Sequence, residues 1–509
     1  MQEATRVSAN DYLRRILLSP VYEVAEFTPL QSMSRLSQRL HNAIFIKRED
    51  LQPVHSFKLR GAYNRIAQLS DEQKARGVIA ASAGNHAQGV ALSAAKLGIQ
   101  ATIVMPVTTP DIKVSSVRAR GAQVVLRGEN FDEANQYCQE LMTQHGYTMI
   151  PPFDDPDVIA GQGTIGKELL DQDNHLDAIF VPVGGGGLAA GIAVYIKQLL
   201  PNIKVIAVEP HESACLKAAL QAGEPTTLDR VGLFADGVAV KRIGQETFRL
   251  CQQYIDEVVT VSSDEICAAM QDIFDDTRAI SEPSGALALA GLKRYISDHQ
   301  LTNQRLACIL SGANMNFHNL RYVSERSELG EKKEIILAVT IPERVGAYLE
   351  FVEYLGGRSI TEFNYRYGDN RLANIYVGIK VADREQELPE IIETLRQADY
   401  QVVDLTDDEI AKLHVRHMVG GKAPRPLKEH IFSFEFAEQP RALLRFLQTL
   451  GPKWNITLFH YRNHGAAYGQ VLVGFEDNGE DLLTLTQYFD QIGFTYHCET
   501  NNPACQFFL

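Results

Sequence analysis

The segment AIFVPVGGGGLAAGIAVYI, residues 178–196, joins an apolar run to four consecutive glycines and a second apolar run. The segment approaches membrane-spanning length, but Pro182 and the glycines interrupt it, and charged residues, Asp177 and Lys197, flank it. A buried strand, a loop and a helix therefore fit it better than a membrane-spanning helix. Consecutive glycines let the main chain wrap closely around a phosphate, with backbone amides and a helix N-terminus as donors. The segment therefore predicts an anion site, although it lacks the lysine and hydroxyl residue of a nucleotide P-loop.

Short β-branched runs alternate with longer helical patterns on both sides of this segment, from about residue 44 to 325. This alternation is typical of a parallel sheet covered by helices, and it predicts an α/β fold. One helix is expected over residues 85–98, where apolar residues recur at helical spacing and Gly98 marks the end. The strands are expected at residues 43–47, 78–82, 101–106, 122–126, 177–183, 204–209 and 305–310.

Two further motifs of this region carry residues that are suited to chemistry. HSFKLRGA, residues 55–62, places Lys58 near an expected helix start, where a lysine held away from water has the depressed pKa that a Schiff-base nucleophile needs. SAGNHAQG, residues 82–89, joins an expected strand to a helix, so its free amides suit a carboxylate, and Asn85 can hydrogen-bond a ring hydroxyl. On these motifs alone, a solvated lysine and an ordinary asparagine-capped turn remain alternatives.

The alternation of short strand patterns with long helical patterns ends after about residue 330, and the remaining chain nearly repeats itself. Residues 341–356 match residues 436–451 at an offset of 95, and two further segments match in the same order. These matches predict two copies of a βαββ-type module, joined by a stretch rich in glycine, proline and basic residues. The predicted organisation is a first domain at 1–325, a linker at 326–334, a first module at 335–407, a linker at 408–428 and a second module at 429–509.

The composition limits the possible partners. The 509 residues carry a formal charge of −14, so the overall field disfavours nucleic acid and anionic membranes, while 45% hydrophobic residues can fill several cores. The seven cysteines are scattered without a C-x-x-C pair, which indicates free thiols in a reducing cytosol. The first twenty residues do not resemble a secretory signal. A cytoplasmic protein without a membrane partner is therefore expected.

Together these features resemble the fold-type II pyridoxal-phosphate family, whose fold is that of the tryptophan synthase β chain. The resemblance covers almost the whole chain, through KREDLQPVHSFKLRGAY, ASAGNHAQGVA, PVGGGGLAAG, GLFADGVAVKRIG, EPSGALALAG and LSGANMNFH. It implies a pyridoxal 5′-phosphate cofactor, with Lys58 as the Schiff-base lysine, Asn85 beside the ring hydroxyl and Ser311 facing the pyridine nitrogen. The implied phosphate cup consists of Gly184, Gly185, Gly186, Gly187 and Leu188. The implied substrate-carboxylate site consists of Ser82, also a candidate catalytic residue, with Ala83, Gly84, Asn85 and His86.

The resemblance also implies a reaction. A neutral Ser311 hydroxyl cannot hold the pyridine protonated as an aspartate would, which favours elimination of a β-leaving group over transamination; a helix N-cap is its alternative role. The branch of the family with tandem modules deaminates L-threonine to 2-oxobutanoate and ammonia, a lyase reaction that opens isoleucine biosynthesis. Lys58 would remove the Cα proton. Glu282 and Asp236 are further candidates for lining this cleft.

The repeated modules resemble ACT-like regulatory domains. This resemblance implies an allosteric homotetramer that isoleucine inhibits and valine relieves. The candidate effector or interface residues are Tyr365, Arg366, Tyr461 and Arg462, and sheet packing is the alternative role of their aromatic members. Some relatives bind a cation near the equivalent of Glu209, but Ser213 and Cys215 stand where acids would be needed, so no metal site is predicted.

Three other functions remain open from the sequence. Another fold-type II reaction, such as serine dehydration, threonine synthesis or cysteine synthesis, would use the same cofactor residues. A non-catalytic amino-acid sensor would keep the fold without the chemistry. A dinucleotide-dependent dehydrogenase needs an acidic residue about 20 positions after its glycines, and Glu209 lies 22 after Gly187. The lysine motif and the SAGNH motif, which a dehydrogenase does not require, favour the pyridoxal-phosphate interpretation.

Overall fold

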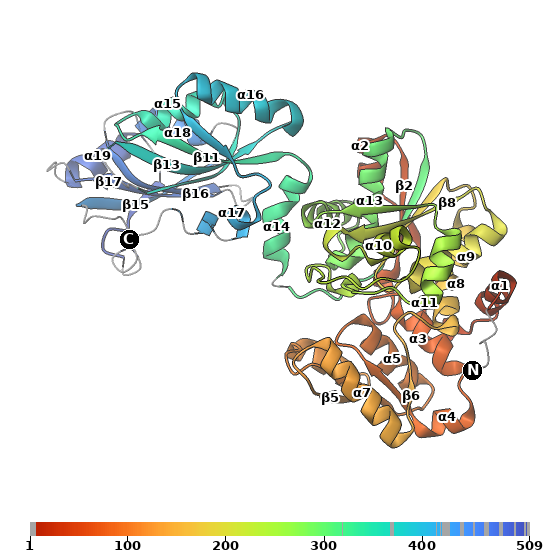
Figure 1. The fold of residues 1–509 in the computed structure, drawn as a ribbon. Helices are drawn as coiled ribbons and strands as arrows, with labels where there is room; N and C mark the ends of the chain where they lie inside the picture. Colours follow the sequence, from red (N-terminus) through yellow and green to blue (C-terminus); the bar gives the residue numbers. More distant parts are fainter. Residues whose placement is uncertain are drawn as a thin grey trace. The chain divides into compact units, whose positions relative to one another are not determined.

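The computed structural model of the chain describes residues 7–317, 319–366, 371–413, 415–417, 419, 428–437, 442–450, 454–462, 468–477, 482–492, 495–502 and 505. The chain divides into two compact units, Met1–Gly330 and Glu331–Leu509 (Figure 1). This boundary falls within the linker predicted for residues 326–334. Each unit buries its own hydrophobic core.

The larger sheet of the first unit has the strand of the glycine loop near its centre. The sheet contains β1 Leu30–Ser32, β2 Ala43–Arg48, β7 Ala178–Pro182, β8 Lys204–Pro210, β9 Glu257–Val261 and β10 Arg305–Leu310. The strand order is β1-β2-β10-β7-β8-β9, in which β1 runs antiparallel to β2 and all other neighbours are parallel. Strands β7 and β10 are buried almost throughout, which explains their continuous apolar sequences.

A separate, smaller sheet forms from four parallel strands in the order β5-β4-β3-β6. These strands are β3 Val78–Ala81, β4 Ala101–Met105, β5 Gln123–Leu126 and β6 Thr148–Met149. All seven expected strands exist, but the expectation of a single sheet is wrong, because strands and helices alternate in the same way whether they join one sheet or two. Strands β1, β6 and β9 were not expected; β1 and β6, with three and two residues, are too short to show a pattern.

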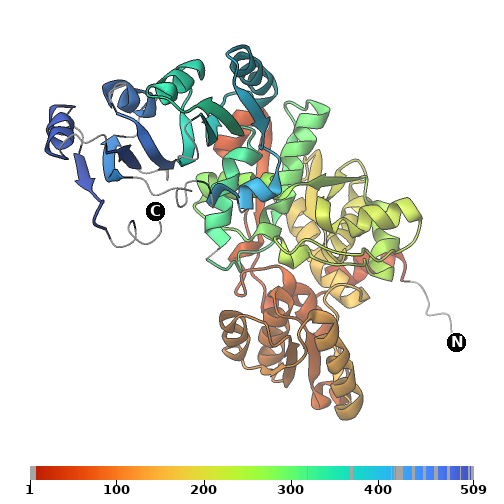
Figure 2. The ribbon, with the colours of Figure 1, turned by 60° about the vertical axis from the view of Figure 1, so that its left-hand side comes forward.

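Helices cover both faces of the two sheets in the first unit (Figures 1 and 2). They are α1 Ala9–Leu17, α2 Ser34–Leu40, α3 Lys58–Ala67, α4 Asp71–Arg76, α5 Asn85–Lys96, α6 Asp111–Arg118, α7 Phe131–His145, α8 Pro156–Gln172, α9 Gly187–Leu199, α10 Cys215–Ala222, α11 Gln245–Tyr254, α12 Ser263–Thr277, α13 Pro283–His299 and α14 Asn319–Gly330. On the larger sheet, α1, α8, α9 and α11 pack on one face and α2, α12 and α13 on the other. On the smaller sheet, α3, α5 and α6 share one core and α7 packs in another.

Local sequence signals fix the ends of the helices that surround the site. Asp155 caps α8 by accepting hydrogen bonds from the amides of Asp157 and Val158, and Pro156 occupies the first helical position. Helix α5 begins at Asn85 as expected and ends at Lys96, just before Gly98 in the left-handed region at φ +67°. The positions of these helix starts are therefore set by the sequence next to them.

The second unit is one eight-stranded antiparallel sheet in the order β14-β11-β13-β12-β16-β17-β15-β18. The first half contains β11 Glu334–Pro342, α15 Ala347–Tyr354, β12 Ile360–Arg366, β13 Leu372–Lys380, α16 Arg384–Gln397 and β14 Gln401–Asp404. The second half contains β15 Glu429–Ala437, α18 Ala442–Leu450, β16 Ile456–Arg462, β17 Tyr468–Glu476, α19 Leu482–Ile492 and β18 Thr495–Cys498. Each half is a βαββαβ module, so the expected βαββ module omits a second helix and a fourth strand. The short helices α17 Glu409–Leu413 and Val415–His417 lie between the halves.

The two modules join through β12 and β16. The register pairs Glu362 with Arg462, Asn364 with His460 and Arg366 with Leu458. Because residues of β12 correspond to residues 96 positions later in the repeat, Asn364 is paired with its own equivalent. The joint therefore has local twofold symmetry, and one core is shared by both modules.

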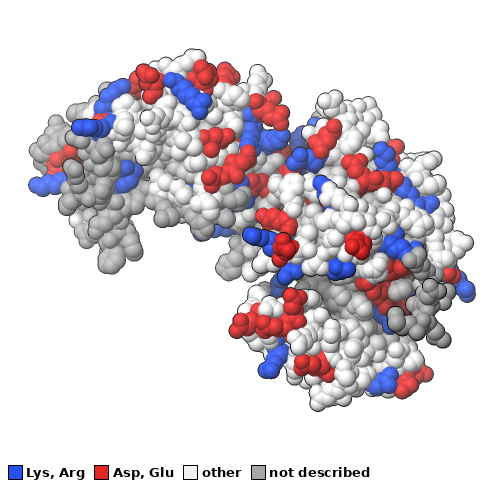
Figure 3. All heavy atoms as spheres, viewed as in Figure 1, with Lys and Arg blue, Asp and Glu red and all other residues white. Residues whose placement is uncertain are grey.

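Charged side chains of both signs are interspersed over the face of the molecule that Figure 3 shows. In the part of the chain that the structure describes, no helix combines the length and apolar composition needed to cross a membrane.

Candidate active site

Lys58 is the first residue of α3, and its amine is turned into the protein. Its Nζ donates a hydrogen bond to the carbonyl oxygen of Pro152 at 3.1 Å and lies 5.2 Å from the ring centre of Phe57. Burial lowers the pKa of Lys58 to about 8, and the negative charge of Glu282 partly opposes this effect. A substantial fraction of this amine is therefore neutral near physiological pH, as a nucleophile or base requires.

Four fully buried charges hold the helix that begins at Lys58. Arg60 donates to both carboxylate oxygens of Glu49 at 2.8 Å and to Glu168 at 2.6 Å. Lys47 donates to the other oxygen of Glu168 at 2.5 Å. These side chains come from β2, the turn after it, α3 and α8, and none is exposed to solvent. Two cations and two carboxylates thus compensate one another beneath the site.

The glycine loop runs from the end of β7 into α9, and two of its carbonyl groups are bound by side chains of the protein. The carbonyl oxygens of Gly184 and Gly185 accept hydrogen bonds from Cys215 Sγ at 3.3 Å and Thr247 Oγ1 at 2.7 Å. Among the described residues, no acceptor is recorded for the backbone amides of residues 184–187. Gly186 adopts φ +89°, and a Cβ on Gly185 would lie 2.1 Å from the ring of Phe153. The loop is therefore a glycine-dependent cradle of free donors at a helix N-terminus.

The segment 82–86 connects the end of β3 to α5. Asn85 is the first residue of the helix, and the Oγ of Ser82 accepts a hydrogen bond from the amide of Gly84 at 3.3 Å. His86 is buried, and its Nε2 lies 2.8 Å from the carbonyl oxygen of Ile150. Burial, together with the nearby positive charge of Lys58, lowers the pKa of His86 to about 3. His86 is therefore neutral at physiological pH and serves to hold this segment against residue 150.

Ser311 follows β10 and lies next to the Lys58 segment. Its Oγ donates a hydrogen bond to the carbonyl oxygen of Ser284 at 3.2 Å, and its carbonyl oxygen accepts from the amide of Phe57 at 3.2 Å. The alternative role of Ser311 as a helix N-cap is wrong, because residues 312–317 are not helical. The contact with Phe57 brings the end of β10 directly to the residue before Lys58.

The two further candidates, Glu282 and Asp236, differ in their surroundings. Glu282 is buried, accepts a hydrogen bond from Asn85 Nδ2 at 2.7 Å and another from the amide of Asn314 at 3.0 Å. Burial, with repulsion from Asp236, raises the pKa of Glu282 to about 7. Asp236 is exposed and pairs with Lys113 at 2.8 Å. Glu282 therefore belongs to the centre of the site and Asp236 to its rim.

The predicted residues converge through these contacts. The segments that follow β3, β7 and β10 all lie at the carboxyl ends of parallel strands, where α/β proteins bind ligands. Pro152 and Phe153 link Lys58 to Gly185, and Glu282 links Asn85 to the Ser311 loop. Sequence reasoning missed Asn314 and Thr247, which are distant in the chain from the residues that they contact.

The residues present fit pyridoxal phosphate. The free amides of the glycine loop suit its phosphate, and the low pKa of Lys58 suits attachment to its aldehyde. The buried hydroxyls of Ser56 and Ser284 have no hydrogen-bond partner in the described part of the chain, although both flank this centre. Buried polar groups normally have partners, so these orphaned atoms indicate a polar ligand or water beside them.

Glu209 lies beneath the glycine loop rather than in the site. It is buried and accepts hydrogen bonds from the amides of Leu216 and Lys217 at 2.8 and 2.9 Å. Burial raises its pKa to about 7. Among the described residues, no group of three His, Cys, Asp or Glu side chains is arranged to hold a metal ion.

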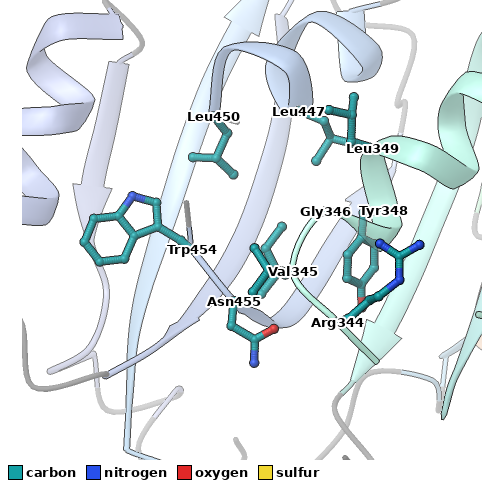
Figure 4. Close-up of a pocket in the computed structure, with 10 residues that line it drawn as sticks. Arg344, Val345, Gly346, Tyr348, Leu349, Leu447, Leu450, Trp454 and Asn455 are labelled. Carbon is teal, nitrogen blue, oxygen red and sulfur yellow. The ribbon is translucent and has the colours of Figure 1, made fainter. Parts of the chain in front are cut away.

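In the second unit the candidate effector residues lie within the sheet. Tyr365 and Tyr461 are buried in the shared core, and Arg366 donates to both oxygens of Glu429 at 2.9 and 2.7 Å. The side chain of Arg462 lies outside the described residues. A small pocket lies elsewhere between the two modules, where Figure 4 shows residues from the start of α15 facing residues from the end of α18. It is lined by Arg344, Val345, Gly346, Tyr348, Leu349, Leu447, Leu450, Trp454, Asn455 and Ile456.

Comparison with known proteins gives two family matches. Residues 22–312 match the family described as pyridoxal-phosphate dependent enzyme. Residues 325–415 and 420–509 each match the C-terminal regulatory domain of threonine dehydratase. The fold class expected from the sequence, with a fold-type II catalytic domain and two regulatory modules, is thereby confirmed, as is the pyridoxal-phosphate cofactor.

Individual relatives agree with these matches over nearly the full length. The chain is 63% identical over 501 residues to the biosynthetic L-threonine dehydratase of Escherichia coli K12, covering 98% of this chain and 97% of the relative. It is 52% identical over 516 residues to the mitochondrial threonine dehydratase of Saccharomyces cerevisiae, covering 98% and 89%. The solved structure of the processed form of threonine deaminase isoform 2 from Solanum lycopersicum superposes with a TM-score of 0.62 at 51% identity, covering 63% of this chain and 93% of that one.

Proposed function

Because this chain belongs to the pyridoxal-phosphate dependent enzymes, and within them to the threonine dehydratases with a C-terminal regulatory region, we propose that it deaminates L-threonine to 2-oxobutanoate and ammonia. The reaction eliminates water from the β-carbon and would open isoleucine synthesis. Membership in this enzyme family removes the non-catalytic sensor and the dinucleotide-dependent dehydrogenase as alternatives. Serine is the competing substrate against which threonine is tested.

The proposal depends above all on the Lys58 amine, which has a pKa of about 8 where the glycine loop, Asn85 and Ser311 converge. Lys58 would carry the aldehyde of the cofactor, and the amides of Gly184 to Leu188 would hold its phosphate. Asn85 would face the ring hydroxyl and Ser311 the pyridine nitrogen. When bound, the cofactor supplies a conjugated ring that stabilises negative charge at the Cα atom of the substrate.

The residues of this chain then have distinct tasks. The amides at the start of α5, with Ser82, would bind the substrate carboxylate at a positive helix end. The neutral Nζ of Lys58 would take the Cα proton, because burial disfavours its charged form. The uncharged Ser311 hydroxyl would leave the ring without a full positive charge, which favours departure of the β-hydroxyl over transamination. The partly buried position of Lys58 would limit the access of water to these steps.

The catalytic claim is tested by chemistry at one amine. Borohydride reduction of the holoenzyme followed by peptide mapping is expected to place the cofactor on Lys58, and Lys58→Ala is expected to lose both the label and 2-oxobutanoate formation. Exposed Lys96→Arg serves as the matched control and should retain both. Pyruvate formation from serine, measured in parallel, gives the substrate preference. A label on another lysine, or action restricted to O-acetylated or O-phosphorylated substrates, would refute the proposal.

The pocket of the second unit supports a regulatory role. Its leucine, valine and tryptophan side chains suit a branched aliphatic side chain, and Arg344 supplies a positive group at its border (Figure 4). We propose isoleucine as the inhibitor and valine as the opposing effector of a cytoplasmic homotetramer. An effector acts by binding one conformational state better than another. Isoleucine should therefore turn the threonine saturation curve sigmoidal, and valine should reverse this change.

Titration of isoleucine against threonine turnover tests the regulatory proposal, and light scattering tests the tetramer. Leu349→Asp places a charge in the apolar pocket and is expected to weaken inhibition at least about tenfold, because an aliphatic side chain bound there would leave that charge partly desolvated and unpaired. Exposed Leu372→Asp, in the same unit, is the control and should respond like the unaltered chain. Hyperbolic kinetics that are indifferent to isoleucine would end the regulatory proposal and leave the catalytic one intact.

A further inference from the structure

The side chain of Asn85 is held in a closed ring of hydrogen bonds. Its Nδ2 donates to Oε1 of Glu282 at 2.7 Å, and its Oδ1 accepts from Nδ2 of Asn314 at 2.7 Å. The backbone amide of Asn314 donates to Oε2 of Glu282 at 3.0 Å and closes the ring. Three residues from α5, the start of α13 and the loop after β10 thus determine one another's orientation.

The donors and acceptors of this ring permit one orientation of the Asn85 amide. Asn314 Nδ2 uses its second N–H on the carbonyl oxygen of Val54, also at 2.7 Å, so the Asn314 amide is itself fixed. Because Asn314 Nδ2 is a donor, the group of Asn85 that faces it must be the oxygen, so the NH₂ of Asn85 faces Glu282 and donates to its Oε1. A half-turn of the Asn85 amide would place oxygen against carboxylate and NH₂ against NH₂. The arrangement leaves one N–H of Asn85 unused by the ring.

Glu282 is placed specifically for this contact. It stands at the N-cap position of α13, yet its side chain does not cap the helix. Within the described residues its carboxylate is bound by Asn85 and by the amide of Asn314 and forms no ion pair, and 4% of the residue is exposed. A Cβ at Gly312 would lie 2.6 Å from Oε1, so the glycine leaves room for the carboxylate. A buried carboxylate that forgoes both a cap and an ion pair needs the two N–H donors that it receives.

We propose that Glu282 and Asn314 are positioning residues that lock the Asn85 amide so that its free N–H, and not its oxygen, faces the ring oxygen of the cofactor. The inference rests on the proposed role of Asn85 in cofactor binding. A fixed N–H donor favours the negatively charged form of the ring oxygen, and a freely rotating amide would do so only part of the time. Glu282 and Asn314 act through Asn85 and need not touch the cofactor.

The test compares Asn314→Ala and Glu282→Gln with the unaltered holoenzyme. Asn314→Ala removes the donor that fixes Oδ1 of Asn85. Glu282→Gln replaces one of two acceptor oxygens with an NH₂ group and opposes a donor to a donor. Each of the two variants should weaken cofactor binding about tenfold, because a buried hydrogen bond loses one of its partners. Each should also shift the pH midpoint of the visible absorbance of the lysine-bound cofactor. Exposed Asn202→Ala is the matched control and should change neither.

A double-mutant cycle separates positioning from general structural support. In the Asn85→Ala background, adding Asn314→Ala should have little further effect on affinity or on the absorbance midpoint, because its target is already absent. Full additivity would overturn the inference, as would unchanged affinity and spectrum in both single variants. If Glu282→Gln fails to fold, Asn314→Ala decides alone. An unaltered chain without visible absorbance from a lysine-bound cofactor would instead refute the proposed function.

Discussion

The Arg60 guanidinium forms two hydrogen bonds of 2.8 Å with the Glu49 carboxylate, entirely out of contact with solvent. The pair joins the first helical turn after Lys58 to the end of β2, the strand beside β10. Because the position of the Lys58 amine depends on the start of α3, this ion pair fixes Lys58 relative to the larger sheet. Its contribution lies in geometry, since buried ion pairs often add little net stability.

Replacing Arg60 by lysine should therefore be costly although the charge is kept. Lysine cannot reproduce the planar fork that reaches Glu49, Glu168 and Thr164 together. We expect the free energy of unfolding to fall by about 3 kcal/mol, as for other buried pairs that lose a partner. Urea unfolding measures this change. The control is Arg76, which forms an exposed ion pair with Glu72, and Arg76→Lys should lower the free energy of unfolding by less than about 0.5 kcal/mol. Equal midpoints for the two variants would show that α3 does not need the Arg60 network.

Gly185→Ala should abolish the anion cradle. The added methyl group would lie 2.1 Å from the Phe153 ring, closer than any real contact, so either the loop or the segment behind Lys58 must move. We expect cofactor affinity to fall by at least about 100-fold, because several phosphate donors move together. Equilibrium dialysis of pyridoxal phosphate measures the affinity. Gly223→Ala, where no atom lies within 4 Å, should lose only about 1 kcal/mol of stability and bind the cofactor normally. Normal binding by Gly185→Ala would exclude the loop as the phosphate site.

The pKa of Glu209 predicts how stability depends on pH. Burial raises this pKa from its ordinary value of 4.5 to about 7, so between these pH values the folded chain holds a proton that the unfolded chain has released. Stability should therefore fall as pH rises from 4.5 to 7, by up to about 3 kcal/mol from this group, and Glu282 acts in the same direction. Glu209→Gln cannot titrate and should flatten this dependence. Denaturant unfolding at pH 5 and pH 7.5 measures it, with exposed Glu72→Gln as the control. Identical slopes for Glu209→Gln and the unaltered chain would contradict this assignment.

Arg366→Gln should loosen the two regulatory modules. Arg366 belongs to the first module and Glu429 to the second. Without the guanidinium, the nearly buried carboxylate of Glu429 keeps only one of its described side-chain contacts, the hydrogen bond from Thr457. We expect a loss of about 3 kcal/mol in the unfolding of the second unit, measured by calorimetry. The exposed pair of Lys332 and Glu385 provides the control, Lys332→Gln. If Arg366→Gln unfolds at the same temperature as that control, the ion pair does not hold the modules together.

Local signals account for what the sequence could predict. The glycine loop, the start of α3 and the SAGNH turn each depend on residues that are adjacent in the chain, and all three form as expected. Four strands of the larger sheet, β2, β7, β8 and β10, were found for the same reason, since each is a short apolar run, whereas β1 and β9 were not. The division into two sheets depends on which strands pair, and no local pattern records that choice.

The contacts that sequence reasoning missed join residues at long separations in the chain. Arg60 contacts Glu168 across 108 positions, Asn85 contacts Glu282 across 197, and Asn314 contacts Asn85 across 229. A polar residue that pairs at such distances leaves no periodic trace in its own segment. The second helix and fourth strand of each module were missed because the recognised repeat ends before them.

The symmetric joint between β12 and β16 explains why the repeat lies in a single chain. Each module offers the same strand to the other, so two separate copies of one module could pair in this manner. A covalent connection makes the encounter intramolecular, at an effective concentration that does not depend on the amount of protein present. The paired sheet can then form at any level of expression, even when free copies of one module would be too dilute to meet.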